Sequence, residues 1–99
     1  MKKIDLIMSL YNAADKNDKP EISAAIDALN TTFKTLIGFV PAYLANDSKP
    51  DADLFASARE ALKTLKRHAV AQGVDFPMPE DDRALRLYII DYGRELLFH

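Results

Sequence analysis

The sequence predicts an all-α protein folded as an antiparallel four-helix bundle. Two observations indicate this class. The 99 residues contain only three glycines and five prolines, and these fall mostly between segments whose apolar residues recur every three or four positions. We therefore expect a single domain over residues 1–99 with helices at about 3–15, 20–45, 50–72 and 79–97, joined by short loops.

The first two helices are predicted from apolar stripes with a polar loop between them. The first stripe consists of Ile4, Ile7, Met8, Tyr11 and Ala14. The second alternates by four and three residues, a heptad seam, and consists of Ile22, Ile26, Leu29, Phe33, Leu36, Val40 and Tyr43. Asp18 or Lys19 is the expected N-cap of the second helix, with Pro20 in its first turn. Because Pro41 lacks an amide donor and Gly38 precedes it by one turn, we expect a bend or an early end there.

The third helix is predicted between a capping signal and a glycine. Ser48 and Asp51 match a capping box that would open it. Its apolar stripe consists of Phe55, Ala58, Leu62, Leu65 and Ala69. Gly73 follows in the position that ends many helices. The proline-rich stretch after it predicts an extended linker whose Phe76 covers the end of the bundle.

The fourth helix is predicted to be apolar on two sides. Acidic residues at 80–82 suit its first turn, where the helix dipole favours negative charge. The inward stripe consists of Leu85, Tyr88, Ile89, Tyr92 and Leu96. A second stripe of Leu87, Ile90 and Leu97 lies about 150° away at 100° per residue. A four-helix bundle needs only one such face, so the second stripe packs on the first helix or the Phe76 linker, is buried in a dimer, or binds a partner.

Two groups of basic residues are the candidate binding residues. Arginine beside exposed aliphatic residues is common in recognition surfaces, and the predicted partner-binding set is Arg83, Arg86, Leu87, Ile90, Arg94 and Leu97. A basic stripe on the third helix consists of Arg59, Lys63, Lys66 and Arg67. This stripe is either a solvated face whose aliphatic stems cover the seam or a contact for anionic lipid, an acidic protein or nucleic acid.

The composition argues against catalysis and against metal or cofactor binding. Cysteine is absent, which excludes a disulfide, a thiol nucleophile and a thiolate metal site. Neither His68 nor His99 has a His or carboxylate three or four positions after it, the spacing that helical metal sites use. Asp81 and Asp82 point about 100° apart, so they fit the start of a helix better than a catalytic pair. A net charge of −2 also argues against a general nucleic-acid binder. We expect a non-enzyme without a metal or cofactor.

The chain resembles the immunity proteins for pediocin-like (class IIa) bacteriocins, of the enterocin A immunity type. The features that carry the resemblance are Met1-Lys2-Lys3 and Leu10-Tyr11-Asn12 in the first helix, the long heptad helix, Phe76 in the linker, and the stretch from Leu85 to Gly93-Arg94. By position, Phe76, Gly93 and Arg94 match the family most directly. The assignment of the second apolar stripe and the basic residues is our own inference.

The resemblance implies a cytoplasmic four-helix bundle, partly associated with the inner face of the membrane. Such a protein would protect a producer cell from its own pore-forming peptide by binding the toxin together with its receptor, the mannose phosphotransferase permease. The C-terminal half would decide which peptide is countered. Two alternatives remain: a small intracellular regulator that binds nucleic acid through the basic stripe, and a helical chaperone or adaptor that holds an amphipathic helix in a groove.

Overall fold

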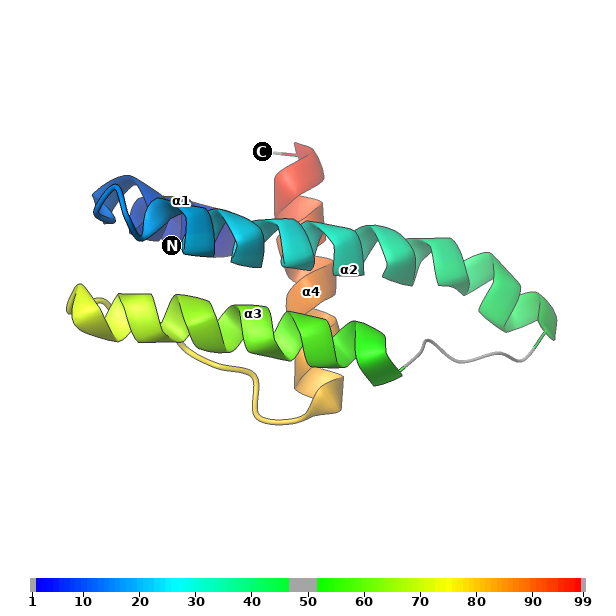
Figure 1. Cartoon of the computed structure of the whole chain (residues 1–99). Coiled ribbons are helices and arrows are strands. Elements are labelled where there is room, and N and C mark those ends of the chain that lie inside the picture. The colour runs from blue at the N-terminus through cyan, green and yellow to red at the C-terminus, as the bar shows by residue number, and fades with distance from the viewer. Residues whose placement is uncertain (1, 47–51, 99) are drawn as a thin grey trace.

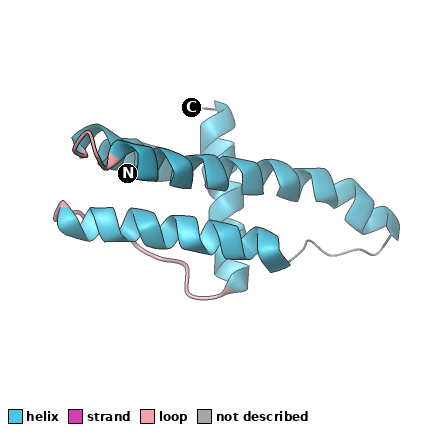
Figure 2. Ribbon diagram, in the orientation of Figure 1, coloured by secondary structure: helices cyan, strands magenta, loops and turns pink. Residues whose placement is uncertain are grey.

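The computed structural model describes the backbone of residues 2–46 and 52–98, and the side chains of residues 2–36 and 55–98. The described chain forms four helices in the order α1 (Lys3–Ala13), α2 (Lys19–Asn46), α3 (Ala52–Ala71) and α4 (Asp82–Phe98). Loops join α1 to α2 and α3 to α4, and no strand occurs among the described residues (Figure 2). The predicted four-helix bundle is therefore confirmed, with helix bounds within three residues of those expected.

The bundle is organised around the antiparallel pair α2 and α3, which share the most extensive interface. Figure 1 shows α1 beside the first part of α2, and α4 crossing α2 and α3 at a steep angle. Helix α4 contacts all three other helices. One face of α4 therefore closes the core, whereas the opposite face is turned outward.

The core contains most of the predicted seam. The buried residues of α2 and α3 include Ile22, Leu29, Phe33, Leu36, Ala58, Leu62, Leu65 and Ala69. Ile26 and Phe55 are partly buried against this core. Phe76 of the linker is fully buried, as expected. The side chains of Val40 and Tyr43 lie outside the described residues, as does the predicted capping box of Ser48 and Asp51.

The expected stripe of α1 is corrected, and the expected irregularity of α2 at Pro41 can be described. Leu10 is fully buried and Met8 is 40% exposed, so the buried face of α1 is rotated from the predicted stripe. The reason is that α1 packs into a corner between α2, α3 and α4, which selects Ile4, Ile7 and Leu10. Helix α2 continues past Pro41 to Asn46, close to its expected end at 45. Of the bend or early end expected at Pro41, the early end does not occur, and the ribbon curves in this part (Figure 1).

The helix ends that hold α4 in place follow the expected chemistry. Gly73 has a φ of 71° after α3, and the amide of Val74 donates to the Ala69 carbonyl at 2.8 Å. Together with the bond from the Gly73 amide to the Val70 carbonyl at 3.1 Å, this is a Schellman motif. At the start of α4, the Asp81 carboxylate accepts from the Ala84 amide at 2.8 Å and caps the helix. The linker between these two ends is thereby fixed on both sides.

Candidate functional site

The outward face of α4 carries the predicted partner-binding residues. At 100° per residue they span an arc of about 100° on one side of the helix, and Phe98 extends the arc by about 20°. We call this set the α4 outer face; it consists of Arg83, Arg86, Leu87, Ile90, Arg94, Leu97 and Phe98. Leu87 is 56% exposed, Leu97 64% and Phe98 83%, whereas Ile90 is partly buried against the core. Most of the second apolar stripe is therefore not covered by the rest of the bundle.

The three arginines of this face are exposed and project from among the apolar residues. Within the described part of the chain, Arg83, Arg86 and Arg94 make no ion pair or hydrogen bond. Their guanidinium groups therefore keep their donors for another molecule, and each presents a fixed fork suited to carboxylate or phosphate.

Contacts made by the opposite, buried face of α4 determine how the outer face is oriented. Leu85, Ile89 and Tyr92 are buried, and the Tyr92 hydroxyl donates to Asn30 Oδ1 of α2 at 2.6 Å. Gly93 touches the Phe33 ring so closely that a Cβ there would overlap three ring carbons. Of the predicted inward stripe, Tyr88 is only partly buried, and Leu96 is 36% exposed. Close approach at Gly93 and the bond from Tyr92 fix which side of α4 is left outside.

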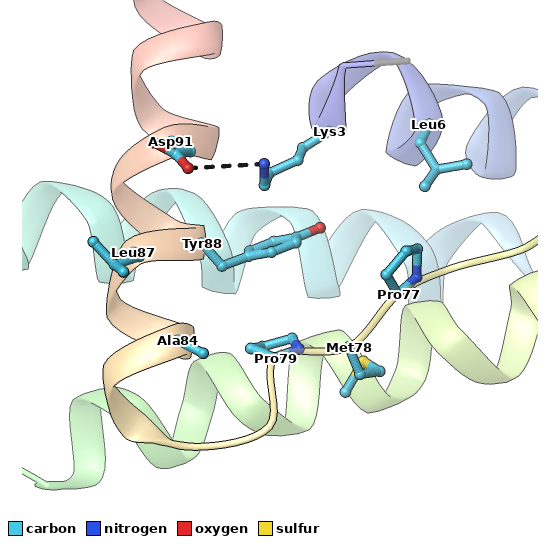
Figure 3. A pocket seen from close by; sticks show the side chains of 9 residues that line it. All are labelled: Lys3, Leu6, Pro77, Met78, Pro79, Ala84, Leu87, Tyr88 and Asp91. Carbon is cyan, nitrogen blue, oxygen red and sulfur yellow. Dashed lines mark ion pairs between the residues drawn. The ribbon is translucent and has the colours of Figure 1, made fainter.

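A pocket of about 470 Å³ lies where α1, the linker and the first half of α4 meet. Figure 3 shows Tyr88 extending from α4 into this space, between Lys3 of α1 and the linker prolines. The pocket is lined by Lys3, Leu6, Pro77, Met78, Pro79, Ala84, Leu87, Tyr88 and Asp91. Leu87 belongs to both the pocket and the α4 outer face, so the two are continuous.

Three polar groups stand at the rim of this apolar pocket. Lys3 Nζ lies 3.9 Å from Asp91 Oδ2, the length of a loose ion pair, and 5.4 Å from the centre of the Tyr88 ring. Burial raises the pKa of Tyr88 above its ordinary value, and the nearby Glu95 carboxylate raises it further. The phenol is therefore neutral at physiological pH and available as a hydrogen-bond donor.

Glu95 positions the α1 wall of the pocket. Its Oε1 accepts from the backbone amide of Ile4 at 3.2 Å, which satisfies one of the free amides at the start of α1. The side chain of Lys2, at the N-cap, makes no such bond. A carboxylate here also complements the positive end of the α1 dipole. The start of α1 is thus held against α4 by a residue 91 positions away in the sequence.

The basic stripe of α3 is engaged in contacts within the protein. Arg59 pairs with Asp82 at the start of α4, and Arg67 pairs with Glu21 in the first turn of α2. Lys66 Nζ donates to the Phe76 carbonyl at 2.8 Å, and Lys63 pairs with Glu60 at 3.3 Å. These contacts tie α3 to α2, the linker and α4. A binding role for the stripe stays a prediction, but the arginines of the α4 outer face have the freer guanidinium groups.

The sequence predicts most residues of the α4 outer face but does not predict the pocket beside it. Leu87 was predicted to bind a partner, whereas Lys3, Leu6, Met78 and Asp91 received no functional role. The pocket residues come from the two ends of the chain and the linker, and no spacing rule connects such distant segments. The basic character of Met1-Lys2-Lys3 was the only local signal at the α1 wall.

Comparisons with known proteins give no relative. No protein-family model, curated protein or solved structure matches the chain. Within residues 2–46 and 52–98, no group of three His, Asp or Glu residues is placed to hold a metal ion. None of the described helices has the length and apolar character needed to cross a membrane.

Proposed function

We propose that the protein is a non-catalytic immunity protein of the pediocin-like bacteriocin type, which acts by docking its α4 outer face on a toxin-bound membrane receptor. The observation that carries the docking step is the exposure of Leu87 and Leu97 beside three arginines without acidic partners in the described chain. An exposed apolar surface edged by arginine is the composition of a recognition surface. The sequence resemblance supplies the biological setting, with the mannose phosphotransferase permease as the expected receptor.

The two faces of α4 have separate roles in this function. The inner face contributes Leu85, Ile89 and Tyr92 to the core. The outer face contributes little to the stability of the isolated chain, because its apolar side chains remain largely in water. Substitutions on the outer face are therefore expected to change protection without changing the fold.

The test is a protection assay in a sensitive lactic acid bacterium. Cells that express the chain are challenged with a panel of pediocin-like peptides, and the minimal inhibitory concentration is measured. We expect the wild-type chain to raise this concentration for at least one peptide, and we expect Leu87→Asp and Arg94→Glu each to abolish the increase. Circular dichroism should show unchanged helical content in both variants.

Matched controls come from exposed positions on other helices. Val70 of α3 is 66% exposed, so Val70→Asp introduces the same charge at a similarly exposed apolar residue. Lys34 of α2 is exposed, and Lys34→Glu makes the same charge change as Arg94→Glu. Both controls should keep full protection. Protection that survives both α4 substitutions would contradict the docking face, and a wild-type chain that protects against no peptide would contradict the immunity function.

A further inference from the structure

We propose that the pocket between α1, the linker and α4 holds a bulky apolar side chain from an acidic segment of the partner polypeptide. The inference rests on the proposed function in taking α4 as the docking face, and it adds the chemistry of the segment that docks. Leu87 connects the pocket with the α4 outer face, because it lines the pocket and is more than half exposed on that face.

The apolar interior of the pocket fits a side chain. Its walls come from Leu6, Met78, Leu87 and the Tyr88 ring, together with Ala84 and two prolines. A volume of about 470 Å³ lies within the range of pockets that hold small molecules, so one aromatic or large aliphatic side chain has ample room. Burial of such a side chain against these walls would provide the main part of the affinity.

The rim favours a peptide group over a charged head group. Lys3 and Asp91 carry opposite charges and lie 3.9 Å apart, so the pair has no net charge. A carboxylate at this position would face Asp91, and an ammonium group would face Lys3. A peptide unit offers one acceptor and one donor, so its carbonyl accepts from Lys3 or the Tyr88 hydroxyl while its N–H donates to Asp91. An apolar side chain flanked by peptide groups therefore matches both the walls and the rim.

The arginines next to the pocket select acidic residues in the same segment. Arg83 precedes Leu87 by four residues and Arg94 follows it by seven, which places them about 6 and 10 Å from Leu87 along the helix axis. An extended chain advances about 3.3 Å per residue. Acidic residues two or three positions to either side of the apolar anchor would therefore reach these guanidinium groups.

Defined peptides test this inference with the isolated protein. The probe is a heptapeptide with blocked ends, phenylalanine at its centre, glutamates two positions to each side and serines elsewhere. In ¹H–¹⁵N spectra we expect saturable shifts at Leu6, Ala84 and Tyr88 at millimolar peptide. The same peptide with lysines in place of the glutamates should bind at least about tenfold more weakly, because the arginines then face like charge. A peptide with serine at the centre should show no saturable binding.

Variants of the pocket give the second arm of the test. Ala84→Leu places a larger side chain at the pocket wall and should weaken binding of the glutamate peptide at least about tenfold, the factor expected when burial of one large apolar side chain is lost. Ala24→Leu, at an exposed position of α2, is the matched control and should leave binding unchanged. If Ala84→Leu alters the fold, Leu87→Ser removes a pocket wall from an exposed position and should weaken binding severalfold.

Each remaining outcome overturns the inference. Equal binding of the glutamate and lysine peptides would contradict the preference for an acidic segment. Chemical shift changes confined to residues outside the pocket would contradict the pocket as the binding site. Tighter binding of decanoate than of the glutamate peptide would make the occupant a carboxylate amphiphile. These measurements need no cells, so they are independent of the protection assay. If the protein protects cells but binds no peptide, only this inference is contradicted. If the protein binds the peptide but does not protect cells, only the proposed immunity function is contradicted.

Discussion

Both faces of α4 carry aliphatic residues, but the two faces have opposite roles in the molecule. Ile89 and Leu85 are almost completely buried, whereas Leu87 and Leu97 are more than half exposed. All four are aliphatic, and they alternate along a single helix of 17 residues. The difference arises from Gly93 and Tyr92, which bring one side of α4 against α2. The presence of aliphatic residues alone therefore does not separate core from recognition surface; the contacts of a few neighbouring residues, and the arginines found only on the outer face, distinguish the two.

The largest expected effect is the difference in stability between alanine substitutions on the two faces of α4. Ile89→Ala should lower the free energy of unfolding by about 2–4 kcal/mol, since it creates a cavity in the core. Leu87→Ala should change it by no more than about 0.5 kcal/mol, because that side chain is largely in water. Urea unfolding followed by circular dichroism measures both. Similar losses for the two variants would mean that the faces are not distinct.

The second prediction concerns the close contact that sets the orientation of α4. Gly93→Ala should destabilise the protein by about 1–3 kcal/mol despite the better helix propensity of alanine, because the new methyl group overlaps the Phe33 ring. The double variant Gly93→Ala with Phe33→Leu should be more stable than the sum of the single effects predicts. A double-mutant cycle from urea unfolding measures this coupling. Purely additive effects would show that the Gly93 contact does not set the packing.

The smallest expected effect is the loss of stability at alkaline pH that comes from Tyr92 on the inner face of α4. Burial raises the pKa of Tyr92 to about 12, with a further contribution from Asp27. Because an unfolded tyrosine has a pKa near 10, the unfolded chain loses this proton first as the pH rises. Stability from this group is therefore complete below pH 10 and is lost as the pH rises toward 12.

Tyr92→Phe tests this response. At neutral pH the variant should lose about 1 kcal/mol, the contribution of the hydrogen bond to Asn30. Above pH 10 its stability should fall less steeply than that of the wild-type chain, and lysine titration, which both proteins share, cancels in the comparison. Parallel stability curves from pH 8 to 11, measured by urea unfolding, would contradict the assigned pKa shift.

The helices and their ends could be predicted from the sequence because their determinants are local. The seam of α2 follows from heptad spacing, and the end of α3 follows from the tolerance of Gly73 for positive φ. The exposed second stripe of α4 was also predictable, since the fourth helix has more apolar residues than one inward face needs. In each case the pattern lies within about 20 consecutive residues.

The features that could not be predicted depend on contacts between distant segments. Leu10 replaces Met8 in the core because of how α1 packs among three helices. The cap on Ile4 comes from Glu95, at the far end of the chain. The pairs that engage Arg59 and Arg67 likewise depend on tertiary packing, so a stripe that is cationic in sequence is largely neutralised in the fold.

The contact between Ile4 and Glu95 also constrains when the binding surface can form during synthesis. The α1 wall of the pocket is anchored by α4, and the opposite wall is α4 itself. A nascent chain can pair α2 with α3 as soon as both have left the ribosome, whereas contacts of high sequence separation form late. The pocket therefore cannot form in a translation product that ends before α4, and such a product carries no copy of the α4 outer face.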